Sequence, residues 1–131
     1  MIAVIFEVWP EPAQRERYFD LAGQLRAELE DVDGFISIER FESLTDPGKV
    51  LSLSFWRDED AVRTWRTNAA HRDAQRAGIT EVFAHYRLRV AGVSRDYGMS
   101  DRAQVPTDSA AVWPGRDSPG PSRGGGSGHL A

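Results

Sequence analysis

The chain has 131 residues, no cysteine and a formal net charge of −4, with acidic and basic side chains interspersed. These features exclude disulfides and thiol nucleophiles, and the lack of a basic stripe argues against a nucleic-acid partner. No apolar run approaches the roughly 20 residues of a membrane span, and the apolar N-terminus lacks the basic start of a signal peptide. We therefore expect a cytoplasmic protein without a membrane partner.

The first hundred residues alternate between strand and helix patterns. β-branched and aromatic side chains mark the strands, and apolar residues at three- and four-residue steps mark the first helix. A turn signal, Asp46-Pro47-Gly48, joins the second and third strands into a hairpin. In chain order we predict a strand at 2–9, a helix at 11–30, strands at 35–43 and 49–56, a helix from Asp58 to Gly78, and a strand at 82–93.

The second helix has clear start and stop signals. Asp58 is a natural N-cap, because its carboxylate can accept a hydrogen bond from a free amide of the first turn. Gly78 is a natural stop, because glycine readily adopts the left-handed conformation after a helix. Between these ends, Asn68 is a candidate helix break.

The order strand, helix, strand, strand, helix, strand predicts a ferredoxin-like α+β fold with an antiparallel sheet and both helices on one face. In the second strand a period of two puts Phe35 and Phe41 on one face and Ile36 and Ile38 on the other. With apolar residues on both faces and only two helices, we expect a second copy to cover the free face and form a homodimer.

The same alternation in the last strand separates two groups of side chains. Tyr86 falls on one face with Val82, and Phe83 falls on the other face with His85 and Arg87. After about residue 99 the composition changes, and the Gly/Ser/Pro-rich run cannot bury enough apolar surface to fold. We therefore predict a domain at 1–99 and an extended, disordered tail at 100–131, in which Trp113 is either exposed or an anchor.

Several cues together resemble the antibiotic biosynthesis monooxygenase (ABM) family over about residues 1–97. They are the element order, Phe55-Trp56-Arg57-Asp58-Glu59-Asp60-Ala61, Trp65, and His71-Arg72-Asp73-Ala74-Gln75 with Gly78. The resemblance implies a ferredoxin-like monomer that pairs into a dimeric α+β barrel. It also implies three possible activities: oxidation of aromatic substrates without metal or flavin, oxidation of quinols, or degradation of heme.

The heme-degrading branch fits the sequence less well. Its pattern needs a histidine about ten residues after the helix tryptophan, where this chain has Gln75, and an asparagine in the first strand, where it has Glu7 or Val8. His71 follows Trp65 by only six residues. Heme therefore stays an alternative, and no metal site is expected.

The candidate site residues each have a structural reading beside the functional one. Trp65 could wall a pocket or pack in the core, and His71 could be a general base or an ordinary helix histidine. Tyr86, Phe83 and Asn68 could contact a substrate, and Arg87 could hold an anionic or phenolate group. On an unbroken helix Trp65 and His71 do not share a face, so the pair needs a break near Asn68.

These residues lead to one functional expectation and two alternatives. We expect a cofactor-independent monooxygenase that oxidises a small aromatic substrate, such as a phenol, quinol or anthrone, with molecular oxygen as co-substrate. The pocket should lie between the sheet and the helices. The alternatives are a heme-binding or heme-degrading enzyme and a non-catalytic small-molecule-binding module of the same fold.

Overall fold

A computed structural model describes residues 1–68, 72–73, 76, 81–112 and 115. The chain divides into two compact units, Met1–Gly92 and Val93–Ala131. Each unit is described on its own. Among the described residues, none of the helices combines the length and the apolar character needed to cross a bilayer.

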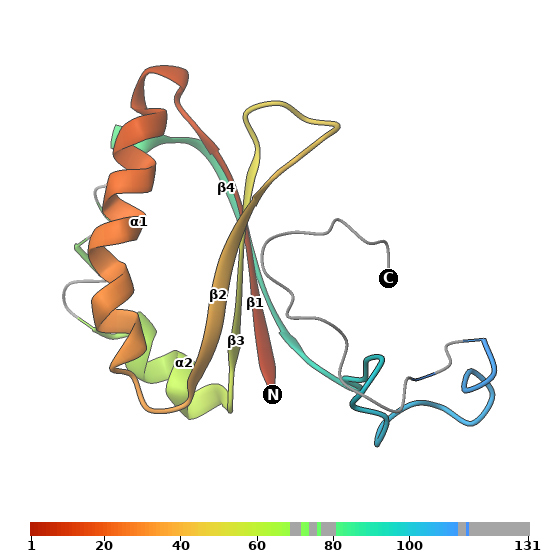
Figure 1. Ribbon diagram of the computed structural model, residues 1–131. Helices are drawn as coiled ribbons and strands as arrows, with labels where there is room; N and C mark the ends of the chain where they lie inside the picture. Colours follow the sequence, from red (N-terminus) through yellow and green to blue (C-terminus); the bar gives the residue numbers. More distant parts are fainter. Residues whose placement is uncertain (69–71, 74–75, 77–80, 113–114, 116–131) are drawn as a thin grey trace. The chain divides into compact units, whose positions relative to one another are not determined.

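The first unit has the predicted element order and a four-stranded antiparallel sheet. Neighbouring strands follow the order β2-β3-β1-β4, and both α-helices cover the same face of the sheet (Figure 1). This arrangement confirms the ferredoxin-like α+β fold. The elements are β1 (Ile2–Pro10), the short 3-10 helix η1 (Pro12–Gln14), α1 (Arg15–Glu30), β2 (Phe35–Glu42), β3 (Val50–Trp56), α2 (Glu59–Arg66) and β4 (Phe83–Gly92).

Helix α2 starts at the predicted cap and ends earlier than predicted. The amide of Ala61 donates to Asp58 Oδ1 at 2.9 Å, and this bond holds the pKa of the Asp58 carboxyl below its usual range. The helix ends at Arg66, because the Thr67 hydroxyl bonds back to the Arg63 carbonyl and competes with regular helix geometry. Asn68, the candidate helix break, therefore lies just beyond the C-cap Thr67 of α2.

The core lies between the sheet and the helices in two clusters. The side chains of Trp56, Val8, Val50 and Val82 are almost completely buried. The Trp56 indole N–H donates to Ser54 Oγ at 2.9 Å, so its one polar atom is satisfied inside the core. One cluster contains Leu29, Trp56, Ala61, Val62 and Trp65, and the other contains Val8, Tyr18, Val50 and Val82.

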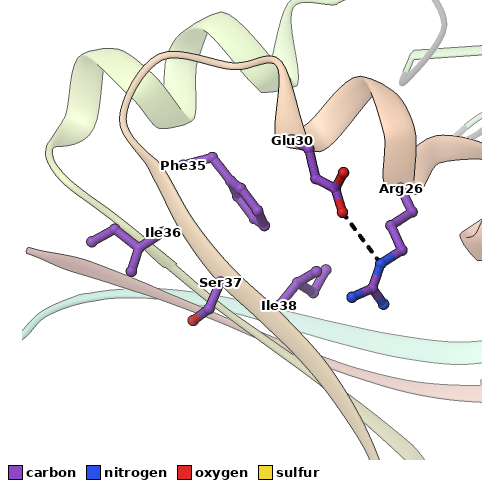
Figure 2. Close-up of a pocket in the computed structure, with 6 residues that line it drawn as sticks. All are labelled: Arg26, Glu30, Phe35, Ile36, Ser37 and Ile38. Carbon is purple, nitrogen blue, oxygen red and sulfur yellow. Dashed lines mark ion pairs between the residues drawn. The ribbon is translucent and has the colours of Figure 1, made fainter.

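The predicted faces of β2 are wrong, because the pairing with β3 shifts register between Phe35 and Ser37. The shift breaks the period of two, so Phe35 and Ile38 both pack against the core. Figure 2 shows these two side chains on one side of the strand and Ile36 on the other. Ile36 and Phe41 are 51% and 42% exposed.

A second register shift changes the faces of β4. The pairing of β1 with β4 is irregular between Trp9 and Pro10, next to the start of β4. As a result Phe83 and Tyr86, which the sequence places on opposite faces, are ring neighbours with centroids 6.0 Å apart. The predicted alternation of side chains between the two faces of β4 therefore holds only for the residues after the shift.

The face of the sheet that is turned away from the helices carries a paired charge cluster. The Glu7 carboxylate on β1 forms ion pairs with Lys49 and Arg89. These partners, Lys49 first, hold the pKa of Glu7 below its usual range although partial burial acts in the opposite direction. Beside this cluster, the His85 ring packs against Trp9 in a tilted arrangement, with ring centroids 5.0 Å apart.

The second unit contains hydrogen-bonded turns over its described residues, and neither helix nor strand. The Gly98 amide donates to the Asp101 carbonyl at 2.8 Å, and Arg102 Nη1 donates to the Gly98 carbonyl at 2.9 Å. This unit begins at Val93, before the predicted domain boundary at residue 99. Trp113 and the Gly/Ser/Pro-rich run lie outside the described residues.

Candidate functional site

The first unit holds a cavity of about 430 Å³ between the sheet and the two α-helices. All four strands and both α-helices contribute to its wall. Its position agrees with the pocket expected from the sequence, and its size is typical of sites for small molecules.

Most of the cavity wall is apolar, and part of it is aromatic. Phe6 of β1 lies 5.7 Å from Phe83 and 6.0 Å from Tyr86, measured between ring centroids. Leu88 and Val90 continue this wall along β4. A flat apolar group could pack against these side chains, because offset and tilted ring contacts are favourable.

A few polar side chains lie together at one end of the cavity. Arg40 of β2 lies directly opposite Ser52 of β3 in the strand register, and Ser54 and Tyr18 line the wall nearby. Burial raises the pKa of the Tyr18 phenol, and the neighbouring Arg40 guanidinium acts in the opposite direction. The phenol therefore stays neutral at pH 7 and is available as a hydrogen-bond donor.

Trp65 belongs both to the core and to the cavity wall. Its side chain is 8% exposed and packs with Trp56 and Val62. It also lines the cavity from the last turn of α2, with Arg66 beside it. The packing role and the pocket-wall role considered from the sequence therefore apply to the same side chain.

The remaining predicted site residues are distributed differently. Phe83 and Tyr86 line the cavity, whereas Asn68 and Arg87 do not. Since Tyr86 and Leu88 point toward the helices, strand alternation places Arg87 on the opposite face. His71 lies outside the described residues, as do Gln75 and Gly78.

Sequence reasoning missed the polar end of the cavity, since Tyr18, Arg40 and Ser52 were not singled out as candidate site residues. Their signal is the hairpin register: once the strands 35–43 and 49–56 are paired across the Asp46-Pro47-Gly48 turn, a strand arginine faces a strand serine.

A second hollow, of about 400 Å³, lies where α1 ends and β2 begins (Figure 2). Its charged side chains, Arg26 and Glu30, form an ion pair at 3.5 Å, and each is more than 60% exposed. Because these charges are solvated and paired with each other, we place the candidate site in the cavity between sheet and helices. No group of three or more potential metal-ligating side chains occurs within the described part of the chain.

Comparison with known structures supports the fold. A solved structure from Deinococcus radiodurans, described as that of a possible antibiotic biosynthesis monooxygenase, is similar with a TM-score of 0.66 and 14% identity, over 76% of this chain and 99% of that one. A protein from Mycobacterium tuberculosis has a TM-score of 0.65 and 21% identity, over 72% and 96% of the two chains. At these identities the similarity concerns the fold alone.

Sequence comparison adds two relatives and a family. The chain is 46% identical over 110 residues to jasmonate monooxygenase ABM of Pyricularia oryzae. The matched segment covers 84% of this chain and 51% of that protein. It is 28% identical over 78 residues to the uncharacterized protein YqjZ of Bacillus subtilis, over 60% and 67% of the two chains. The family model for antibiotic biosynthesis monooxygenase matches residues 1–77. This match covers more than half of the chain, which therefore belongs to the antibiotic biosynthesis monooxygenase family.

Proposed function

We propose that this protein is a monooxygenase that oxidises a small, largely apolar substrate in the cavity between sheet and helices. The main support for this proposal is the cavity itself, which combines an apolar aromatic wall with a few polar groups in a chain of this family. The relative from Pyricularia oryzae is named as a monooxygenase of jasmonate. The chain spans about half the length of that relative, so the activity is proposed for this chain and not carried over.

We further propose that the substrate contains a phenol, quinol or anthrone-like ring. The rings of Phe6, Phe83 and Tyr86 offer an aromatic wall against which such a ring can stack. Substrates of this kind supply their own electrons. The deprotonated ring gives an electron to molecular oxygen, the two radicals combine, and the peroxide loses water to leave a carbonyl. One oxygen atom enters the product and the other leaves as water, so no metal, flavin or heme is required.

The protein then has to exclude water, orient the ring and assist proton transfer. Trp65 lines the cavity and can direct its indole N–H toward a substrate oxygen. The role of His71 as base or proton relay stays a prediction from the sequence. Besides Trp65, the cavity wall contains the Tyr18 phenol, which also carries a proton that it can donate.

The test is oxygen uptake by metal-free protein with a panel of anthrones and hydroquinones, and with jasmonate, without added cofactor. Trp65→Phe should lower kcat at least about tenfold, the effect of losing one oriented donor to the reacting oxygen. Trp9→Phe is the matched control, because Trp9 bonds Asp46 through its indole N–H at 2.9 Å and does not line the cavity. In the same oxygen-uptake assay, His71→Ala tests whether His71 is the general base.

Two results would count against this proposal. If no substrate consumes oxygen while ligands still bind, the chain is a small-molecule-binding module. If hemin binds with a Soret band typical of protein ligation, heme chemistry replaces the cofactor-free reaction. The described residues that line the cavity include no histidine, so a heme ligand would have to come from outside that set.

A further inference from the structure

Arg40 is a cation in the cavity wall, and no carboxylate of the described residues pairs with it. Several other arginines of the first unit form ion pairs, as Arg15 does with Glu42, Arg57 with Asp33 and Arg89 with Glu7. No such pair involves Arg40 among the described residues, and its buried Nε has no hydrogen-bond partner there. A buried, unpartnered guanidinium N–H is unfavourable, so an anionic group from outside the chain would satisfy it.

Two hydroxyl groups lie beside Arg40. Ser52 is directly opposite Arg40 in the β2–β3 register, and the Tyr18 phenol oxygen accepts a hydrogen bond from the guanidinium, which leaves the phenol O–H as a donor. Ser54 already accepts the indole N–H of Trp56. A guanidinium fork and two hydroxyl groups therefore converge on one end of the cavity, a set that suits a ligand with several acceptor oxygens.

Polarity falls in order across the sheet from this end. The strand registers place Arg40 opposite Ser52, Ser52 opposite Phe6, and Phe6 opposite Leu88. All four side chains line the cavity. A ligand that lies across the strands would meet a cation and a hydroxyl at one end and apolar carbon at the other. This gradient fits an amphipathic molecule with a single acidic head.

We propose that Arg40, with Tyr18 and Ser52, binds the carboxylate of a small amphipathic monocarboxylic acid whose apolar part lies against Phe6 and Leu88. A carboxylate fits better than a phenolate, because its two oxygens match the guanidinium fork in a bidentate pair. This inference rests on the proposed function only in taking the cavity as the substrate site. Arg40 thereby becomes the residue that sets the orientation and charge preference of the ligand.

The test is calorimetric titration of the full chain with two acids, 1-naphthoate and jasmonate, and with the methyl ester of each. The wild-type protein should bind each acid more tightly than its ester. Arg40→Gln should weaken acid binding roughly 10- to 100-fold, the range for lost hydrogen bonds to a charged group, and leave ester binding unchanged. Arg40→Lys keeps the charge without the fork and should lie between the two. Arg87→Gln is the matched control, because it removes a cation that does not line the cavity.

The inference is overturned if Arg40→Gln binds the acids as the wild type does, if acid and ester bind equally, or if neither acid binds. If Arg40→Gln fails to fold, Arg40→Lys and Tyr18→Phe are measured in its place. Unchanged acid binding in both of these variants would overturn the inference. Binding is measured without turnover. Absence of oxygen uptake therefore refutes the monooxygenase activity and leaves the carboxylate site at Arg40 untouched. Equal binding of acid and ester refutes the carboxylate site and leaves the monooxygenase activity untouched.

Discussion

Two arginines on neighbouring parts of one sheet differ in the partners that the protein gives them. Arg89 on β4 faces away from the helices and pairs with Glu7, which Lys49 also contacts. Arg40 on β2 faces the helices and has the phenol of Tyr18 and the hydroxyl of Ser52 nearby. The outward cation is neutralised within the chain, whereas the inward cation is supplied with further donors. The difference indicates that charge on the outward face supports the sheet and charge on the inward face serves a ligand.

The largest expected difference between the two faces concerns stability. Trp56→Ala should lower the free energy of unfolding by about 3–5 kcal/mol, since it empties a fully buried position. Phe55 is the neighbouring residue on β3, points to the outward face and is half-buried. Its replacement by alanine should cost less than about 2 kcal/mol. Urea unfolding of the dilute protein measures both, and equal losses would contradict the assignment of the core to the inward face.

The next effect concerns association of two copies, which we propose to occur through the outward face. Phe41 lies on that face and is 42% exposed, so Phe41→Glu should disrupt the dimer at little cost to the monomer fold. Light scattering at micromolar concentration should give twice the chain mass of 14.6 kDa for the wild type and the single mass for the variant.

Leu44→Glu is the control for the dimer, because Leu44 is 99% exposed and follows the end of β2. It should leave the mass at that of the dimer. A wild-type protein that scatters as a monomer would refute the proposed pairing, and would leave the outward face of the sheet without a function in assembly.

The smallest expected effect is a pH dependence at Glu7. Its carboxyl has a pKa below the ordinary value of 4.5, because Lys49 and Arg89 favour the charged form. The stability from this shift is therefore present above pH 4.5 and is lost as the pH falls through the lower, folded-state pKa. Glu7→Gln should remove this part of the acid sensitivity. Melting temperatures measured from pH 6 downward test it, and identical slopes for both proteins would argue against the ion pairs.

The sequence predicted the order of elements well, because each element has its own local signal. The alternation of β1, the apolar stripe of α1 and the cap at Asp58 all depend on residues within one segment, and the structure places them where expected. The family resemblance rested on the same local cues, of which Trp65 now lines the cavity.

The polar end of the site could not be predicted in the same way, because it depends on pairing between segments. A strict period of two, counted from Phe35, puts Arg40 on the wrong face, and only the register shift before Ser37 turns it toward the helices. The shift next to Pro10 likewise brings Phe83 and Tyr86 together. Such shifts are properties of two strands and leave no pattern in either one alone.

The register shift at the start of β2 has a further consequence for association. The order β2-β3-β1-β4 leaves β2 on the edge of the sheet, where unpaired backbone groups could bind a strand of another molecule and start aggregation. An irregular edge with the charged residues Glu39 and Glu42 is a poor template for such growth. The irregularity that turns Arg40 inward thus also makes this edge of the sheet a poor site for strand addition.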